Sequence, residues 1–238
     1  LLNAHFDLRN FKKFEDTLKE FEDWEKSPEA QQHDNFRTHT SIYINSSRVN
    51  GHLMKGTFKE GLKIVPQIEE KLNEYSIFVD QHRILVFNYK IASLHFGSGN
   101  YEKAIDYLHR IIHGPMDMRI DLQCYSRLMH LLSHYELGNY EILDSLSKSV
   151  HRFMEKMKNL TTVEEAVFKF LKTSFQQSPD KIKGALQQLL NEIKHLEKNR
   201  FQTRSFAYLD IISWAESKVY NKTMEQVVHG KYMESKRR

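Results

Sequence analysis

The sequence predicts an all-α fold in which antiparallel helix hairpins stack into an array. Nine glycines and four prolines among 238 residues suit long helices joined by short turns. Stretches in which apolar and polar residues alternate, as half-buried strands require, are hard to find. A seven-residue pattern also recurs: a histidine, an apolar residue, two variable residues, a turn residue, a capping residue and an aromatic. Its four copies begin 47, 43 and 39 residues apart, at His5, His52, His95 and His134, and such self-similarity is typical of repeat architectures.

The clearest hairpin covers residues 85–112. Its turn, residues 97–100, contains two glycines, which tolerate the left-handed backbone conformation at a helix end, and Asn100, which can cap the following helix. Apolar residues after the turn recur at helical spacing and predict one buried face. They are Tyr101, Ala104, Ile105, Leu108, Ile111 and Ile112, and the helix before the turn supplies Leu85, Ile91, Ala92 and Leu94.

In chain order, residues 1–28 are the end of a truncated repeat, in which Asn10 caps the second helix. Residues 35–75 form the next repeat, with a helix over 35–54 and a second helix that Pro66 should kink or split, because proline lacks the N–H that a helix interior needs. Further repeats cover 81–114, 119–158 and 163–198, and helices over 203–235, beginning with one at about 203–220, cap the array. The truncated start predicts that this chain is a piece of a longer protein.

The central hairpin resembles the tetratricopeptide repeat family. Gly99, Tyr101, Ala104 and Ile111, with Ala92 upstream, lie where that family has its small, aromatic and apolar signature positions. The resemblance implies a right-handed α-solenoid. The repeats here exceed the family's usual length of about 34 residues, and Leu143 replaces a small residue in the 119–158 repeat. The whole is similar to divergent long-repeat proteins of Bacteroidetes bacteria, a group of unknown function.

Composition excludes several classes of protein. A single cysteine, Cys124, rules out an internal disulfide and a cysteine-based zinc site, and no apolar run approaches the roughly 20 residues of a membrane span. The net charge of +4 is uneven: residues 1–32 carry −3, and residues 194–238 carry +5. Basic residues do not alternate with aromatics along one face, so we expect no nucleic-acid partner. A cytoplasmic location is expected.

Histidines are the most prominent candidates for chemistry. The four repeat histidines fall on successive repeats, too far apart to share one metal ion. His109 and His113, like His130 and His134, are four residues apart, but neither pair has the intervening glutamate of a zinc protease. We therefore expect no metal site, no cofactor and no catalytic residues, and we interpret the protein as not an enzyme.

The resemblance assigns a concave groove to one stripe of each first helix. The stripe comprises Tyr43, Ser46, Asn50 and Leu53, then Val86, Tyr89, Ser93 and Phe96, then Tyr125, Leu128, Leu132 and Tyr135. Members of the family that clamp chaperone tails use Lys, Arg and Asn there, and this chain offers only Asn50. The aromatic and apolar stripe instead suits a helix or an apolar peptide.

The expected function is a non-catalytic scaffold that binds a protein or peptide in this groove, mainly through Tyr43, Asn50, Tyr89, Ser93, Phe96, Tyr125, Leu132 and Tyr135. Two alternatives stay open for the stripe itself: the chain's own terminal helices can cover it, or a second subunit can. The alternative functions are a sensor or regulatory module of a larger protein, such as a transcription regulator, and a homo-oligomerisation domain.

Overall fold

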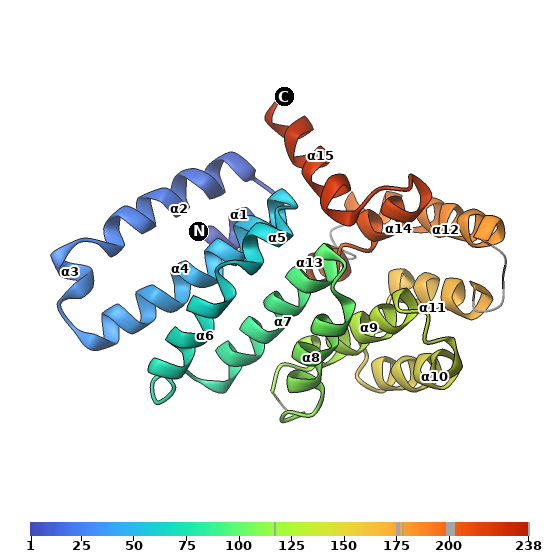
Figure 1. The fold of residues 1–238 in the computed structure, drawn as a ribbon, viewed down its shortest axis with the longest axis horizontal. Helices are drawn as coiled ribbons and strands as arrows, with labels where there is room; N and C mark the ends of the chain where they lie inside the picture. The colour runs from blue at the N-terminus through green and yellow to red at the C-terminus, as the bar shows by residue number, and fades with distance from the viewer. Residues whose placement is uncertain (117, 175–176, 178, 199–202, 238) are drawn as a thin grey trace.

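The computed structural model describes residues 1–116, 118–174, 177, 179–198 and 203–237, and this part of the chain contains helices and no strand. Each helix packs mainly on its neighbours in the chain, from α2–α4 at one end to α10–α12 at the other (Figure 1). The helices are α1 (Leu2–Asp7), α2 (Phe11–Glu25), α3 (Pro28–Gln31), α4 (Asp34–Lys55), α5 (Phe58–Leu62), α6 (Val65–Glu74), α7 (Gln81–Ser98), α8 (Tyr101–Ile112), α9 (Ile120–Glu136), α10 (Tyr140–Lys156), α11 (Thr162–Ser174), α12 (Pro179–Ile193), a 3-10 turn (Lys194–Lys198), α13 (Thr203–Tyr208), α14 (Ile211–Val219) and α15 (Met224–Lys236).

The four copies of the seven-residue pattern share one turn geometry. Their turn residues have left-handed backbones, with φ of 50° at Arg9, 65° at Gly56, 82° at Gly99 and 73° at Gly138. The N–H of the following residue then donates to the carbonyl of the pattern's histidine, at 2.9 to 3.1 Å. This backbone bond is the helix-ending contact of a Schellman motif. The predicted repeat of the turn is therefore confirmed, and Arg9 shows that glycine is favoured there but not required.

The fifth residue after each left-handed residue is buried in all four copies: Phe14, Gly61, Ala104 and Leu143. At Gly61 an added Cβ would lie 2.8 Å from atoms of His52 and Leu94. Small residues at this position allow the two helices of a pair to approach closely, whereas Phe14 and Leu143 fill the same place with a side chain. The fifth position after the left-handed residue therefore holds a non-polar residue in all four copies, but a small one only at Gly61 and Ala104.

Two helix breaks test the predicted boundaries. The split at Pro66 is confirmed, because α5 ends at Leu62 and α6 begins at Val65.

The prediction of a single helix over about 203–220 is wrong, because α13 ends at Tyr208 and α14 begins after Asp210. The Asp210 carboxylate accepts the backbone N–H of Ser213 at 3.0 Å and its hydroxyl at 2.8 Å. Aspartate is a strong N-cap residue, and here it starts a new helix within an apolar stretch.

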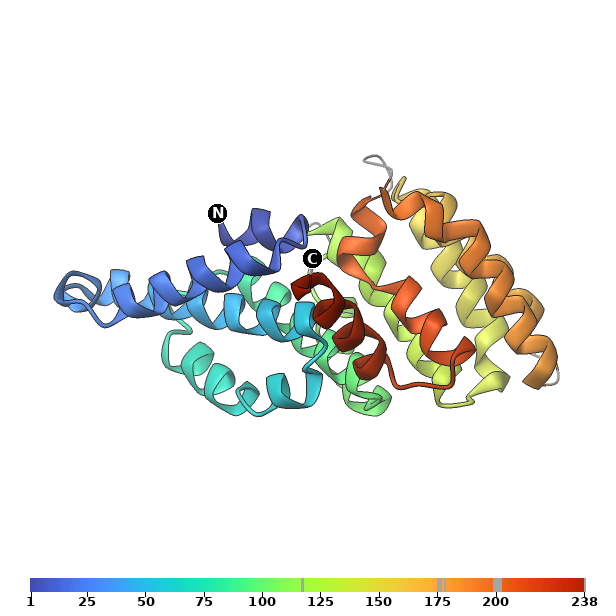
Figure 2. The same cartoon turned by 90° about the horizontal axis from the view of Figure 1, so that it is seen from above.

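The C-terminal helices return along the array instead of extending it. Helix α15 packs on α14, α7, α4 and α2 and lies near the middle of the molecule (Figure 2). The Tyr232 hydroxyl donates to Glu15 at 2.8 Å, and His229 contacts the carbonyl of Lys55 at 3.0 Å. Residues more than 170 positions apart are thus joined, and α15 contacts both α2 and α4.

Gly97 offers a test of helix packing with a matched control. A Cβ at Gly97 would lie 2.7 Å from the buried ring of Phe58, whereas one at Gly184, on the exposed face of α12, would meet nothing within 4 Å. Gly97→Ala should lower the free energy of unfolding by about 1–3 kcal/mol through overpacking. Gly184→Ala should raise it by about 0.5–1 kcal/mol through helix propensity. Urea unfolding measures both, and equal effects would contradict the packing of α5 on α7.

Candidate functional site

A cavity of about 880 Å³, here called the groove pocket, lies among α1, α4, α7, the start of α9, and α13. Its walls include seven stripe residues from the first helices of two neighbouring repeats: Tyr43, Ser46, Asn50 and Leu53 of α4, and Val86, Tyr89 and Ser93 of α7. The structure therefore brings the α4 and α7 parts of the predicted stripe together around one space. Four of the eight residues expected to bind a partner lie in it: Tyr43, Asn50, Tyr89 and Ser93.

The α4 and α7 residues differ in how far they are open to the pocket. Tyr43 is 48% exposed, and the Arg83 guanidinium lies 4.8 Å from its ring centroid and 3.2 Å from its hydroxyl. Ser93 is half-buried. Tyr89 is buried, and its hydroxyl donates to the backbone carbonyl of Tyr208 at 3.0 Å. Asn50 is also buried, and its Oδ1 has no hydrogen-bond partner among the described residues.

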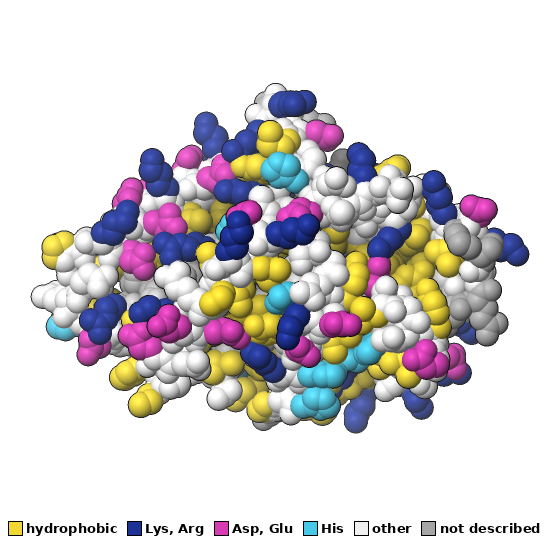
Figure 3. All heavy atoms as spheres, viewed as in Figure 1, with side chains coloured by type: hydrophobic (Ala, Val, Ile, Leu, Met, Phe, Trp, Pro, Cys, Tyr) yellow, Lys and Arg dark blue, Asp and Glu magenta, His cyan; other side chains and the backbone are white. Residues whose placement is uncertain are grey.

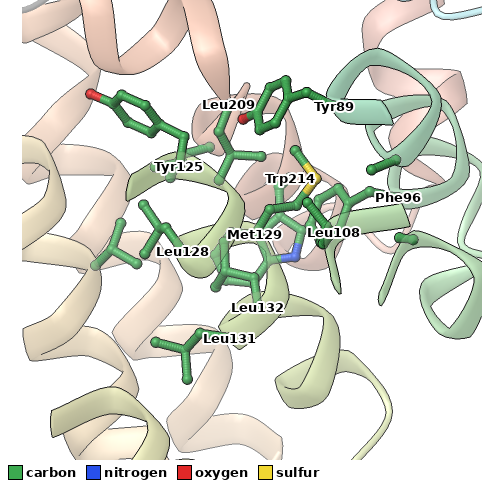
Figure 4. Close-up of a cluster of buried hydrophobic side chains, with 14 of the residues drawn as sticks. Tyr89, Phe96, Leu108, Tyr125, Leu128, Met129, Leu131, Leu132, Leu209 and Trp214 are labelled. Atoms are coloured by element: carbon green, nitrogen blue, oxygen red, sulfur yellow. The ribbon is translucent and has the colours of Figure 1, made fainter. Parts of the chain in front are cut away.

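The five remaining stripe residues lie in the core: Phe96, Tyr125, Leu128, Leu132 and Tyr135. Tyr125 stacks on Tyr208 of α13, with ring centroids 4.5 Å apart, and Tyr135 meets the edge of Trp214 of α14 at 6.1 Å. Figure 4 shows Tyr125 and Leu132 in one cluster with Leu209 and Trp214. The chain's own C-terminal helices thus cover this part of the stripe. While α13 and α14 stay in place, they cover the α9 side chains Tyr125 and Tyr135.

A smaller cavity, of about 340 Å³, adjoins the groove pocket near α13 and α15. Phe96, Ser93 and Tyr208 line it together with apolar residues of α4 and α15. Tyr208 borders both cavities and closes the side of the groove pocket that faces α9. The groove pocket consequently lies mainly over α4 and α7 and reaches only the start of α9, at Arg119 and Leu122.

Lys90, near the middle of α7, is the most perturbed charged group of the groove pocket. It is half-buried, and its ammonium donates only to Ser46, at 3.2 Å to the backbone carbonyl and at 2.5 Å to the hydroxyl. Within the described residues it has no carboxylate in ion-pair contact. Burial lowers its pKa to about 7, against the field of Asp7, which raises it. A lysine that is so easily neutralised marks a candidate functional site.

Asp7 faces the same pocket from α1 and makes no ion pair with Lys90. Burial raises the pKa of its carboxyl group, and the nearby Lys90 lowers it. Lys90 and Asp7 thus share the pocket without a direct ion pair between them.

At the edge of the pocket, Arg119 and Asp121 fix the position of Tyr208. Arg119 binds Asp121 with two nitrogens, at 3.0 and 2.7 Å, and its Nη2 lies 3.3 Å from the Tyr208 hydroxyl, which also donates to Asp121. Burial raises the pKa of Asp121, but the hydrogen bonds from Arg119 and Tyr208 outweigh it and bring the pKa to about 2. The carboxylate therefore stays ionised near neutral pH and keeps α13 attached.

Histidines gather over α8 and α9 in a patch that is separate from the pocket (Figure 3). The Nε2 of His130 lies 3.0 Å from that of His109 and 3.2 Å from that of His134. The ring of His113 is tilted against that of His109, with centroids 5.4 Å apart. The pKa of His130 is lowered to about 3, first by burial and then by the nearby His134, His109, His113 and Arg127. As the side chains stand, no three described His, Cys, Asp or Glu residues are placed to hold a metal ion.

Two of the four repeat histidines, His52 and His134, contact their own turns. The Nδ1 of His52 lies 2.9 Å from the Thr57 hydroxyl, and that of His134 lies 2.9 Å from the side-chain amide of Asn139. In both copies the partner is the residue that follows the left-handed position. The His95 ring instead stacks on Tyr107 of the partner helix α8, and its Nδ1 has no hydrogen-bond partner among the described residues.

Sequence reasoning missed Lys90, Asp7 and Tyr208. A signal for Lys90 existed, because it is the one charged residue among 84–94, an otherwise apolar and polar-neutral stretch. No local pattern could place Asp7 or Tyr208 there, since each reaches the pocket from an end of the chain.

The chain was also compared with known proteins, and no family model, curated protein or solved structure matches it. The resemblance to tetratricopeptide repeats stays a prediction that rests on the quoted residues. None of the described helices combines the length and apolar character of a membrane span.

The histidine patch predicts a pH dependence of stability. The pKa of His130 in the folded protein, about 3, is below the unfolded value of about 6.5, so acid favours the unfolded state as the pH falls below about 6.5. Between pH 7 and pH 5, wild type should lose more free energy of unfolding than His130→Gln, by at most about 2 kcal/mol. Urea titrations at both pH values measure this difference, with exposed His33→Gln as the control. Parallel losses in wild type and His130→Gln would contradict the neutral state of the half-buried His130.

Proposed function

We propose that this chain is a non-catalytic binding module that holds a peptide segment of a partner protein in the groove pocket. Its framework, on this proposal, is a right-handed tetratricopeptide-like solenoid of antiparallel hairpins. Support for the framework comes from the four left-handed turns and from the buried position that holds Gly61 and Ala104. A cytoplasmic location belongs to the same proposal.

The observation that carries the proposal is that the stripe is open over α4 and α7 and closed over α9. The pocket volume of about 880 Å³ lies within the range of ligand sites, roughly 300–1,000 Å³. Its walls offer the aromatic face of Tyr43, the apolar side chain of Val86 and the hydroxyls of Ser46 and Ser93. A peptide presents both apolar side chains and backbone polar groups, so such a mixed wall suits it.

The extent of the open region limits the length of the peptide that can bind. Tyr208, held by Asp121 and Arg119, blocks a chain that would continue from α7 onto α9. The segment therefore spans two repeats and is short. A long helix running over the whole concave face does not fit this arrangement.

A second candidate is a ligand-sensing module of a larger protein, and Lys90 is the observation that favours it. Among the described residues, the half-buried Lys90 ammonium donates only to Ser46. An apolar peptide would not need such a charged group for binding. Binding to such a group can change its charge, which is a property of sensors.

Selection from a random heptapeptide library displayed on phage tests the main proposal. Wild type should enrich a common motif, and a labelled peptide of that motif should bind with a measurable Kd in fluorescence polarisation. Val86→Arg, which fills the pocket, should weaken binding at least tenfold. Ile142→Arg places the same side chain on the exposed surface of α10 and should change little.

Circular dichroism confirms that both variants keep their helical content. Equal binding by Val86→Arg would exclude the groove pocket as the site. Failure of wild type to enrich any motif would contradict peptide binding, and self-association in sedimentation experiments would then favour a second copy of the chain as the occupant.

A further inference from the structure

We propose that the groove pocket binds a small organic carboxylate with an apolar body, and that the Lys90 ammonium is its counter-ion. This inference goes beyond peptide binding and does not depend on it, because it concerns one charged group and its immediate surroundings. It names a ligand class for the same space.

The charge of Lys90 has no carboxylate partner within ion-pair distance in the described part of the chain. Ser46 accepts two hydrogen bonds from the ammonium, which has three N–H groups, so one donor is left for a ligand. An ammonium taken out of water without a carboxylate partner is costly, and proteins usually pair such groups. A bound carboxylate would supply the missing charge.

The other strong cations of the pocket are already matched. Arg83 binds Asp80 at 2.8 Å, and Arg119 binds Asp121 at 2.7 Å. Lys90 has no such partner in the described part of the chain. The charged or titratable groups that share the pocket with it are Asp7 of α1, Tyr43 of α4, Asp80 before α7, His82, Arg83 and Tyr89 of α7, Arg119 before α9, and Tyr208 of α13.

The surroundings of Lys90 also restrict the body of the ligand. Val86, Phe87 and Leu122 contribute apolar surface, so an apolar or aromatic body fits. Asp7 is the nearby anion whose field acts on Lys90. Its negative charge disfavours a second carboxylate on the ligand, and the pocket therefore selects a monocarboxylate.

Binding should depend on pH in a way that separates Lys90 from surface lysines. The pKa of Lys90 is about 7 in the free protein, and only the charged form attracts a carboxylate. Affinity should therefore fall as the pH rises above 7, approaching tenfold per pH unit. Surface lysines, which have pKa values near 10.4, would give no such change between pH 6.5 and 8.5.

Isothermal titration calorimetry with 3-phenylpropionate and its neutral isostere 3-phenylpropionamide tests the inference. Wild type should bind the acid at least tenfold more tightly than the amide at pH 6.5, and this preference should shrink at pH 8.5. Lys90→Met should bind the two probes equally. The control Lys148→Met, on the exposed surface of α10, should behave as wild type does.

Equal binding of acid and amide by wild type would overturn the inference, and so would a preference that survives Lys90→Met or does not change with pH. If Lys90→Met fails to fold, the acid–amide comparison and the pH series on wild type decide the question alone. If peptide selection succeeds and these probes fail, the proposed function stands and this inference falls. If the probes bind as expected and no peptide motif is enriched, the sensor alternative is favoured.

Discussion

The position of Tyr208 is the constraint on which the arrangement of this molecule depends. Its ring stacks on Tyr125, with an interplanar angle of 6°, and meets Tyr89 edge-on at 6.0 Å. Its carbonyl accepts the Tyr89 hydroxyl, and its own hydroxyl reaches Asp121. One residue thus joins α13 to both α7 and α9, and it decides where the open part of the concave side ends.

The helices that follow Tyr208 are held by buried carboxylates. Glu136 of α9 accepts the indole N–H of Trp214 at 2.6 Å and also binds Lys218 of α14. Glu216 of α14 lies 2.8 Å from both Lys194 and Lys231. Burial raises the pKa of Glu216, and the two lysines lower it further than burial raises it. Removal of one partner from such a group is strongly destabilising, so these helices belong to the fold and are not a loose cover.

Local signals in the sequence were sufficient for most of the fold. The turn at Gly99, the cap at Asn100 and the break at Pro66 all follow from backbone geometry within a few residues, and the structure shows each of them. The break at Asp210 was missed, because the apolar run around it resembles a continuous helix. Its capping aspartate was the available signal.

The site was less predictable, for a physical reason. A stripe of aromatic residues shows which face of a helix is apolar, but hydrophobic burial is not directional and does not say what covers that face. Tyr43 and Tyr125 occupy equivalent positions in the pattern, yet one is 48% exposed and the other 1%. The difference comes from Tyr208, which stacks on Tyr125 although the two are more than 80 residues apart. The spacing of apolar residues along the sequence cannot predict such a long-range contact.

The extent of the open groove depends most on whether α13 and α14 are a permanent part of the concave side. Hydrogen–deuterium exchange of the wild-type protein, followed by mass spectrometry, measures this directly. We predict that the amides of α14 exchange as slowly as those of α9, because the two helices share the contacts of Trp214 and Glu136. Fast exchange in α14 beside slow exchange in α9 would contradict the account, and would show that the stripe at Tyr125, Leu132 and Tyr135 opens to other molecules.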